Sequence, residues 1–248
     1  MCARLFSGRG AKRRFVLLAS ALLLSGMVLC ALAGGNGNQN PGVLPPNSNP
    51  YGMSYAEWGG KWWQWALSIP NATSPVFDTT GEYAAIGQSG PVWFLAGDFG
   101  GTVQRTVTVP AGKAVFFPIY NYVWVNMPDY GDNPWSEAQY EYVREFIEES
   151  IDSATLLACE IDGQPVGNIE AYRCVTPYAA AFMATLPDDN LWSAYGVPAG
   201  TYGPSVQGGY YLMLAPLPAG QHTIHIAAAN SSPWSLDVTY DLTVKGGK

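Results

Sequence analysis

Charged residues and histidines are scarce in this chain. Asp, Glu, Lys and Arg make up 12% of its 248 residues, and its only histidines are His222 and His225. Histidine is the commonest metal ligand and a frequent general base, so the chain offers little material for a zinc site or a Ser-His-Asp triad. The HExxH, GxSxG, P-loop and EF-hand patterns are also missing. The sequence therefore gives no support to these classes of protein.

Basic residues are few, and five of the 12 stand within the first 14 positions. A nearly continuous apolar stretch, Phe15 to Leu32, follows them, and Ala31-Leu32-Ala33 supplies the small residues that a signal peptidase requires. This order predicts a secretory signal peptide over residues 1–33, cleaved after Ala33. The alternative is a retained membrane anchor, because Phe15 to Ala33 is 19 residues, near the lower limit for a spanning helix.

Removal of the signal peptide would leave a strongly acidic protein. All 19 acidic residues but only 7 of the 12 basic ones follow residue 33, which gives the mature chain a net charge of −12. Such a surface disfavours nucleic acid and anionic lipid as partners. We therefore expect a secreted or periplasmic protein that contacts an extracytoplasmic polymer or protein surface, with no membrane partner after cleavage.

Cysteine is also scarce, and only Cys159 and Cys174 would remain in the mature chain. Exported proteins meet an oxidising environment, so the sequence predicts a Cys159–Cys174 disulfide. Two buried free thiols are the alternative. Neither residue belongs to a CxxC pair, which argues against redox catalysis or a zinc site.

Composition and periodicity divide the rest of the chain. Residues 34–50, rich in Gly, Asn and Pro, predict a flexible tether, and residues 51–248 predict a single domain. A capping box at Ser54 and Glu57 opens a helix that ends at Pro70. Most of its tryptophans fall on one broad face, so we expect them to be core residues.

A second helix is predicted from Ser136, where Ser136 and Gln139 form another capping box. It carries an apolar face that includes Phe146 and an acidic opposite face. Strong alternation between Leu236 and Val244 predicts a strand with one buried side, and Asp162-Gly163 predicts a hairpin. The expected fold is mainly β: a single β-sandwich, jelly-roll-like, with an N-terminal Trp-rich helix and one inserted amphipathic helix.

Two segments contain residues that could bind a metal ion. Asp129, Asp132 and Asn133 place hard oxygen ligands on a glycine-containing loop, which suits part of a calcium shell; a solvated turn is the alternative. His222 and His225 are three residues apart on an expected strand, so their side chains should point to opposite faces. Calcium is therefore the one candidate cofactor.

Aromatic residues in loop-like sequence are the candidate ligand-binding residues: Trp135, Trp192, Tyr195 and Tyr202. They stand beside Pro, Gly or Asp, outside the predicted helices and strands. Exposed Trp and Tyr side chains stack on sugar rings or anchor protein partners. Catalytic residues remain unknown from the sequence.

Several long motifs resemble a family of uncharacterised secreted bacterial proteins. They are WWQWALSIP (62–70), GQSGPVWFLAG (87–97), VPAGKAVFFPI (109–119), LPAGQHTIH (217–225) and SLDVTYDLTV (235–244). The resemblance covers about residues 51–245. It implies a signal peptide and a single exported domain, and it carries over no catalytic residue.

Three functions are compatible with these observations. The first is an exported, non-catalytic domain that binds carbohydrate or another envelope component, which is an analogy based on the loop aromatics. The second is a secreted polysaccharide hydrolase or lyase, which would need carboxylates converging in a cleft. The third is a structural surface subunit. The absence of catalytic motifs favours the first.

Overall fold

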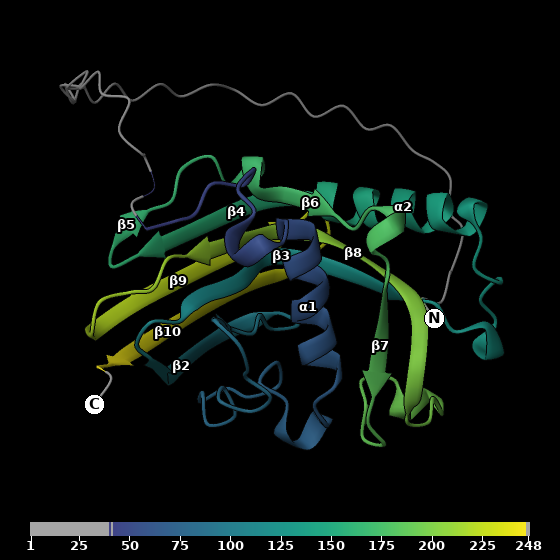
Figure 1. Cartoon of the computed structure of the whole chain (residues 1–248), viewed down its shortest axis with the longest axis horizontal. Coiled ribbons are helices and arrows are strands. Elements are labelled where there is room, and N and C mark those ends of the chain that lie inside the picture. The colour runs from purple at the N-terminus through teal and green to yellow at the C-terminus, as the bar shows by residue number, and fades with distance from the viewer. Residues whose placement is uncertain (1–39, 41, 247–248) are drawn as a thin grey trace, which may run out of the picture. The chain divides into compact units, whose positions relative to one another are not determined.

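The computed structural model describes residues 40 and 42–246, so the predicted signal peptide, residues 1–33, lies outside the described part of the chain. Within that part the protein is mainly β, with two five-stranded sheets, two α-helices and several short 3-10 turns (Figure 1). None of the described helices is long and apolar enough to cross a membrane. The mainly β class predicted from the sequence is therefore confirmed.

Sheet A has the strand order β1-β3-β8-β6, with β7 also pairing with β8. Sheet B has the order β2-β10-β9-β4-β5. The bounds in sheet A are β1 Val92–Phe94, β3 Ala114–Val125, β6 Arg173–Val175, β7 Phe182–Leu186 and β8 Gly200–Leu214. Those in sheet B are β2 Gly101–Pro110, β4 Ala154–Ile161, β5 Gln164–Pro165, β9 Gly220–Asn230 and β10 Ser235–Lys245.

Two sheets agree with the predicted sandwich, but the jelly-roll connectivity is not confirmed. The β1–β3 and β2–β10 pairs are parallel, whereas the remaining strand pairs are antiparallel. The predicted hairpin at Asp162-Gly163 is present between β4 and β5. The predicted alternation of the last strand is also present, because β10 buries every second residue.

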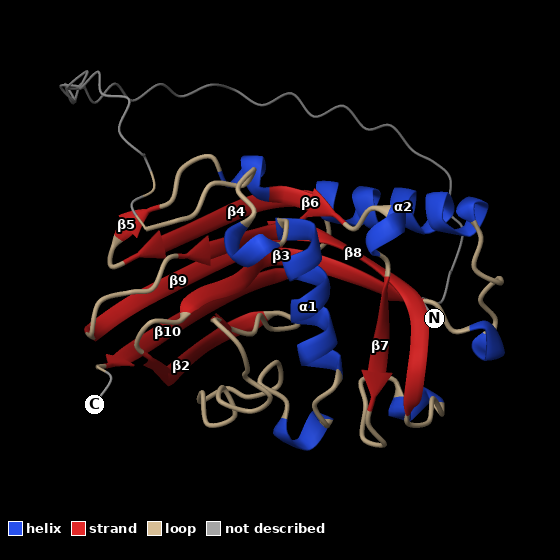
Figure 2. Cartoon of the chain, in the orientation of Figure 1, coloured by secondary structure: helices blue, strands red, loops and turns tan. Residues whose placement is uncertain are grey.

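Contacts place sheet A between helix α1 (Tyr55–Leu67) and a layer formed by helix α2 (Glu137–Asp152) and sheet B, and Figure 2 shows α1 in front of the strands. Helix α1 covers one face, where Gln207 of β8 donates from Nε2 to the Ala56 carbonyl at 3.1 Å. Helix α2 lies on the opposite face, where Val206 packs against its apolar side chains. Sheet B lies on that same face, since Asn230 of β9 donates to the Tyr120 hydroxyl. Strand β8 is therefore buried on both sides.

Helix α1 begins and packs as the sequence predicts. Ser54 and Glu57 form the capping box reciprocally, and Trp62, Trp63 and Trp65 are buried. The Trp62 indole donates to the Leu95 carbonyl at 2.8 Å. Gly59 lets the helix approach sheet A closely, because a Cβ there would lie 2.6 Å from the Gln207 amide. The glycine thus leaves room for the Gln207 side chain between the helix and the sheet.

Helix α2 is capped by Ser136, whose hydroxyl accepts from the Gln139 backbone N–H at 3.1 Å. Its buried residues include Tyr140, Val143 and Ile147, as expected from the periodicity. Phe146 was predicted on the buried face but is exposed. It lies at the margin of the apolar stripe, where the edge of sheet A leaves it uncovered.

A buried arginine joins the loops before and after β1 to sheet B. Arg105 of β2 is 1% exposed, and its guanidinium forms an ion pair with Asp98 at 3.1 Å. It also donates to the Tyr240 hydroxyl and to the carbonyls of residues 76, 78, 96 and 97. All three guanidinium nitrogens therefore have acceptors, which is the condition for burying this charge.

The prediction of a flexible tether over residues 34–50 is wrong for residues 42–50. Val43 is buried and forms an isolated bridge with Leu214, and Leu44 donates its N–H to the Met213 carbonyl at 2.8 Å. Trp58 donates from its indole to the Pro50 carbonyl. Composition suggested a tether, but backbone pairing with the end of β8 and contacts with α1 hold the segment on the domain.

The predicted Cys159–Cys174 disulfide is also wrong in this structure, where both residues are free thiols. Cys159 on β4 pairs with the inward-facing Ile226 and points between the two sheets. Cys174 on β6 pairs with Gly209 and points toward α1. The backbone of sheet A lies between the two layers, so the short sequence separation does not bring the thiols together.

We expect both thiols to resist modification in the folded protein. Burial raises the pKa of Cys159 to about 12 and that of Cys174 to about 12, and only the thiolate is nucleophilic. At pH 8, reaction with Ellman's reagent should be more than about 100-fold slower in buffer than in denaturant. Rapid labelling of the native protein, or a mass change on reduction without unfolding, would contradict this.

Candidate functional site

An aromatic cluster stands at the N-terminal end of α2, and we call its stacked pair, Trp135 and Tyr178, the Trp135 platform. The two rings are parallel within 2°, with centroids 6.1 Å apart. Tyr140 of α2 meets both rings edge-on, at 6.1 and 5.2 Å. Trp135 is half-buried and Tyr178 is 48% exposed. Tyr178 therefore presents an exposed ring that Trp135 and Tyr140 support.

The platform is held by contacts on both of its segments. Trp135 immediately precedes the cap residue Ser136, and Tyr178 begins the 3-10 turn η5 (Tyr178–Ala180). The Tyr140 hydroxyl donates to the Thr176 carbonyl at 3.2 Å, which joins α2 to the segment that carries Tyr178. Burial raises the pKa of Tyr140, and the neighbouring Glu141 raises it further. Tyr140 therefore remains a neutral donor.

A pocket of about 500 Å³ lies at the start of α2, on the side of the helix that carries Tyr142. Its lining combines apolar side chains with hydroxyl and amide groups: Asn133, Pro134, Ser136, Ala138, Gln139 and Tyr142. Trp135 stands in sequence between two of these lining residues. This volume is within the usual range for a small-ligand site, and the lining offers neutral hydrogen-bonding groups.

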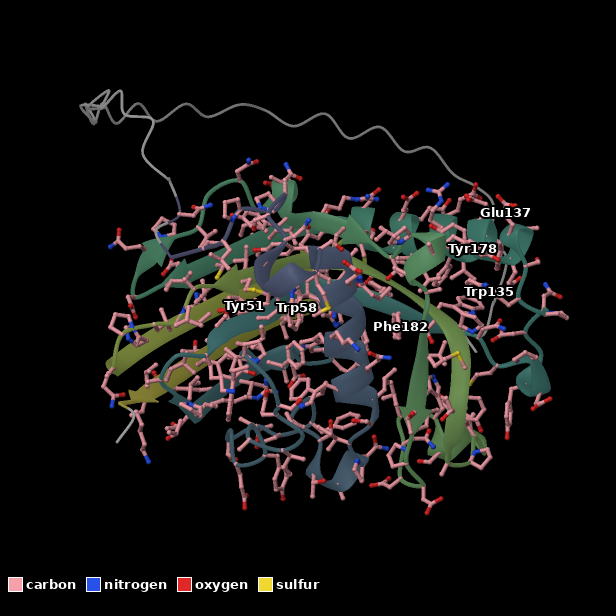
Figure 3. All side chains as sticks on the ribbon, viewed as in Figure 1. Tyr51, Trp58, Trp135, Glu137, Tyr178 and Phe182 are labelled. Atoms are coloured by element: carbon pink, nitrogen blue, oxygen red, sulfur yellow. The ribbon has the colours of Figure 1, made fainter. Side chains whose placement is uncertain are left out.

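Carboxylates border this region of α2. Figure 3 shows Glu137 at the same end of the helix as Trp135 and Tyr178. Arg144 bridges Glu141 and Glu148, at 2.9 and 2.5 Å. The exposed side of the helix is acidic, as the sequence indicated, and hydroxyl groups of a ligand would find acceptors there.

On the other flank of α2, Trp124, Tyr142 and Phe146 form a second group that we call the aromatic corner. Trp124 of β3 meets Tyr142 at 6.1 Å and 83°, and meets Phe146 at 5.3 Å and 78°. Tyr140 and Tyr142 are two residues apart, about 200° around the helix axis. The platform and the corner therefore lie on different sides of the same helix.

The other aromatic residues predicted to bind ligand lie in the loops around η6 (Ser193–Tyr195) and at the start of β8. Trp192 is partly buried against the main core. Tyr195 is exposed, and Tyr202 contacts the ring of Tyr130 at 6.5 Å. The four predicted residues therefore do not form one site. Trp135 contacts Tyr178, whereas Tyr202 contacts Tyr130.

The candidate calcium residues have other roles in the structure. The Asp132 carboxylate accepts from the Met127 N–H at 2.6 Å, which stabilises the turn at η3 (Pro128–Tyr130). Asp129 belongs to that turn, and Asn133 lines the pocket. Within residues 40 and 42–246, no three His, Cys, Asp or Glu side chains are grouped as metal ligands. The loop is thus closed by a hydrogen bond from its own backbone.

The two histidines point to opposite faces of β9, as predicted. His222 shares the inward face with Ile224 and bonds the Asp162 carboxylate through Nδ1 at 2.8 Å. His225 faces outward and contacts Asp237 at 3.2 Å. The Asp162 hydrogen bond raises the pKa of His222, although partial burial opposes it. Each histidine therefore has its own carboxylate partner.

The sequence reasoning missed Tyr178, Tyr142 and Trp124. Tyr142 did carry a signal, because a large aromatic residue stood outside the apolar face of its helix. Tyr178 follows Pro177 in a short turn, and nothing local relates it to Trp135. Trp124 belongs to an aromatic-rich strand that the sequence alone cannot assign to a face.

Comparisons with protein-family models, with curated proteins and with solved structures found no match for this chain. The family resemblance drawn from the sequence motifs therefore stays a prediction. The function has to be argued from the geometry around α2.

Proposed function

We propose that the chain is an exported, non-catalytic domain that binds carbohydrate through the Trp135 platform. The observation that carries this proposal is the parallel Trp135–Tyr178 pair, which Tyr140 contacts edge-on. Sugar rings present apolar C–H faces, and these stack on aromatic rings whose orientation is already set. A supported aromatic pair with one exposed ring suits such a ligand.

The pocket at the start of α2 supports the same ligand class. Asn133, Ser136 and Gln139 contribute amide and hydroxyl groups to its lining. Glu137, at the same end of α2, can accept hydrogen bonds from sugar hydroxyls. A few polar groups beside an apolar surface are the usual composition of a small-ligand site. We propose a polysaccharide of the cell envelope as the partner, consistent with the export expected from the signal peptide.

We propose binding and not turnover at this site. Hydrolysis of a glycosidic bond usually requires a pair of carboxyl groups on either side of the scissile bond. The residues that line the pocket carry amide, hydroxyl and apolar side chains. No described feature favours a hydrolase, a lyase or a structural subunit over a binding domain.

Replacing Tyr178 or Trp135 with Ala should weaken glycan binding at least about tenfold, which corresponds to ~1.4 kcal/mol. The loss is expected because each variant removes one ring of the stacking surface. The measurement is a glycan array followed by titration calorimetry with the best oligosaccharide, together with pull-down on peptidoglycan and cellulose. Tyr178→Ala is the more informative variant because Tyr178 is the more exposed ring.

Phe77→Ala is the matched control, since Phe77 is 47% exposed on another part of the surface. It should bind as the unmodified protein does. Circular dichroism should show the same fold in all variants. Absence of binding to every glycan and polymer would contradict the proposal. Glycan binding of unchanged affinity in both Tyr178→Ala and Trp135→Ala would also contradict it.

A further inference from the structure

The aromatic corner is a second surface with the geometry of a binding site. Tyr142 and Phe146 are one turn apart on α2, and both rings stand nearly perpendicular to Trp124. Tyr142 is 55% exposed and Phe146 is also exposed. Two solvent-exposed rings are thus each held nearly perpendicular to the ring of Trp124.

Negative charge without a counter-ion surrounds the corner. Glu145 and Glu149 each stand three residues beyond an aromatic residue of the corner, so they are its neighbours on the helix surface. Both are exposed, and neither forms an ion pair with any residue that the structure describes. Glu141 and Glu148, by contrast, both form ion pairs with Arg144. The field at the corner therefore favours a cation.

We propose that the aromatic corner binds an alkylated ammonium ion, with the quaternary ammonium head group of choline as its type. The faces of aromatic rings attract such cations through their quadrupole, and perpendicular rings allow several methyl groups to make contact at once. A quaternary ammonium donates no N–H hydrogen bond, so an aromatic surface satisfies it. Glu145 and Glu149 supply the compensating charge. The corner is separate from the Trp135–Tyr178 pair, although Tyr142 also lines the pocket at the start of α2.

The test is a titration of ¹⁵N-labelled protein with choline, followed by NMR at the Trp124 indole N–H. The neutral probe is 3,3-dimethylbutan-1-ol, in which carbon replaces the ammonium nitrogen. Choline should give a saturable shift, and the neutral isostere should bind at least about tenfold more weakly because the cation–π attraction is lost. Equal binding of the two, or no saturable shift with choline, overturns the proposal.

Variants separate the corner from non-specific charge attraction. Tyr142→Ala and Phe146→Ala should each weaken choline binding about fivefold or more, whereas Tyr142→Phe should retain it. Glu145→Gln with Glu149→Gln should weaken it about twofold to fivefold. Phe99→Ala, at 51% exposure, and Glu82→Gln are the matched controls and should have no effect. Unchanged binding by Tyr142→Ala contradicts the site.

Two sources could present this head group, a free ion or a lipid. Co-sedimentation with phosphatidylcholine vesicles that Tyr142→Ala abolishes would assign a lipid source. Saturation by choline without co-sedimentation would assign a free one. Either result supports a binding site at the aromatic corner. The proposal is rejected if the protein does not bind choline and the Tyr142→Ala variant still co-sediments with the vesicles.

Discussion

Replacement of Arg105 with Met should lower the free energy of unfolding by about 3–5 kcal/mol, the range for breaking a buried ion pair. Met fills much of the space but donates no hydrogen bond. The Asp98 carboxylate and the surrounding carbonyls would then lose the donor that satisfies them inside the protein. Urea unfolding followed by far-UV circular dichroism measures the change.

Two controls make the Arg105 result specific. Lys61→Met removes an exposed cation and should change stability by less than about 0.5 kcal/mol. Asp98→Asn keeps an acceptor for the guanidinium and should cost less than Arg105→Met. If Arg105→Met lies within about 1 kcal/mol of the unmodified protein, then Arg105 does not hold the loops around β1.

Truncation of Trp62 to Ala should cost about 3–5 kcal/mol, because it empties the space of a large buried ring. Trp62 is 2% exposed, and its ring contacts both Trp63 and Trp65. The variant would also leave the Leu95 carbonyl without its indole donor. Far-UV circular dichroism during urea unfolding is the suitable measurement, since fluorescence would change with the loss of a tryptophan.

Trp62→Phe separates packing from hydrogen bonding. It keeps an aromatic ring but not the N–H group, so we expect an intermediate loss of about 1–3 kcal/mol. Tyr195→Ala removes an exposed ring and should be nearly neutral. A Trp62→Ala protein as stable as the Tyr195→Ala control would show that α1 contributes little to the core.

Local features could be predicted because they depend on neighbours in the sequence. The Ser54–Glu57 capping box and the Ser136 cap each act within one helical turn. The alternation in β10 follows from the two-residue period of a strand with one buried face. The core position of Trp62 followed from its place on the broad apolar face of α1.

The candidate site could be predicted only in part. Trp135 was identified as an aromatic residue in loop-like sequence, but its partner Tyr178 lies far along the chain. Their parallel arrangement depends on the Tyr140 hydroxyl of α2, which donates to the Thr176 carbonyl, and on Thr176, whose N–H donates to the Gln207 carbonyl of β8. No local sequence pattern predicts the contact between Trp135 and Tyr178. Tyr142 and Trp124 meet for a similar reason, since α2 lies across β3.

By itself, the sequence determined the local elements, the buried faces of the helices and last strand, and the division of polar from apolar residues. Only the tertiary structure decided which layer each side chain enters. Cys159 and Cys174 show the reason: their sequence spacing permits a disulfide, but β4 and β6 belong to different sheets and direct the thiols into different layers. Long-range pairing of strands, and not local propensity, sets those layers.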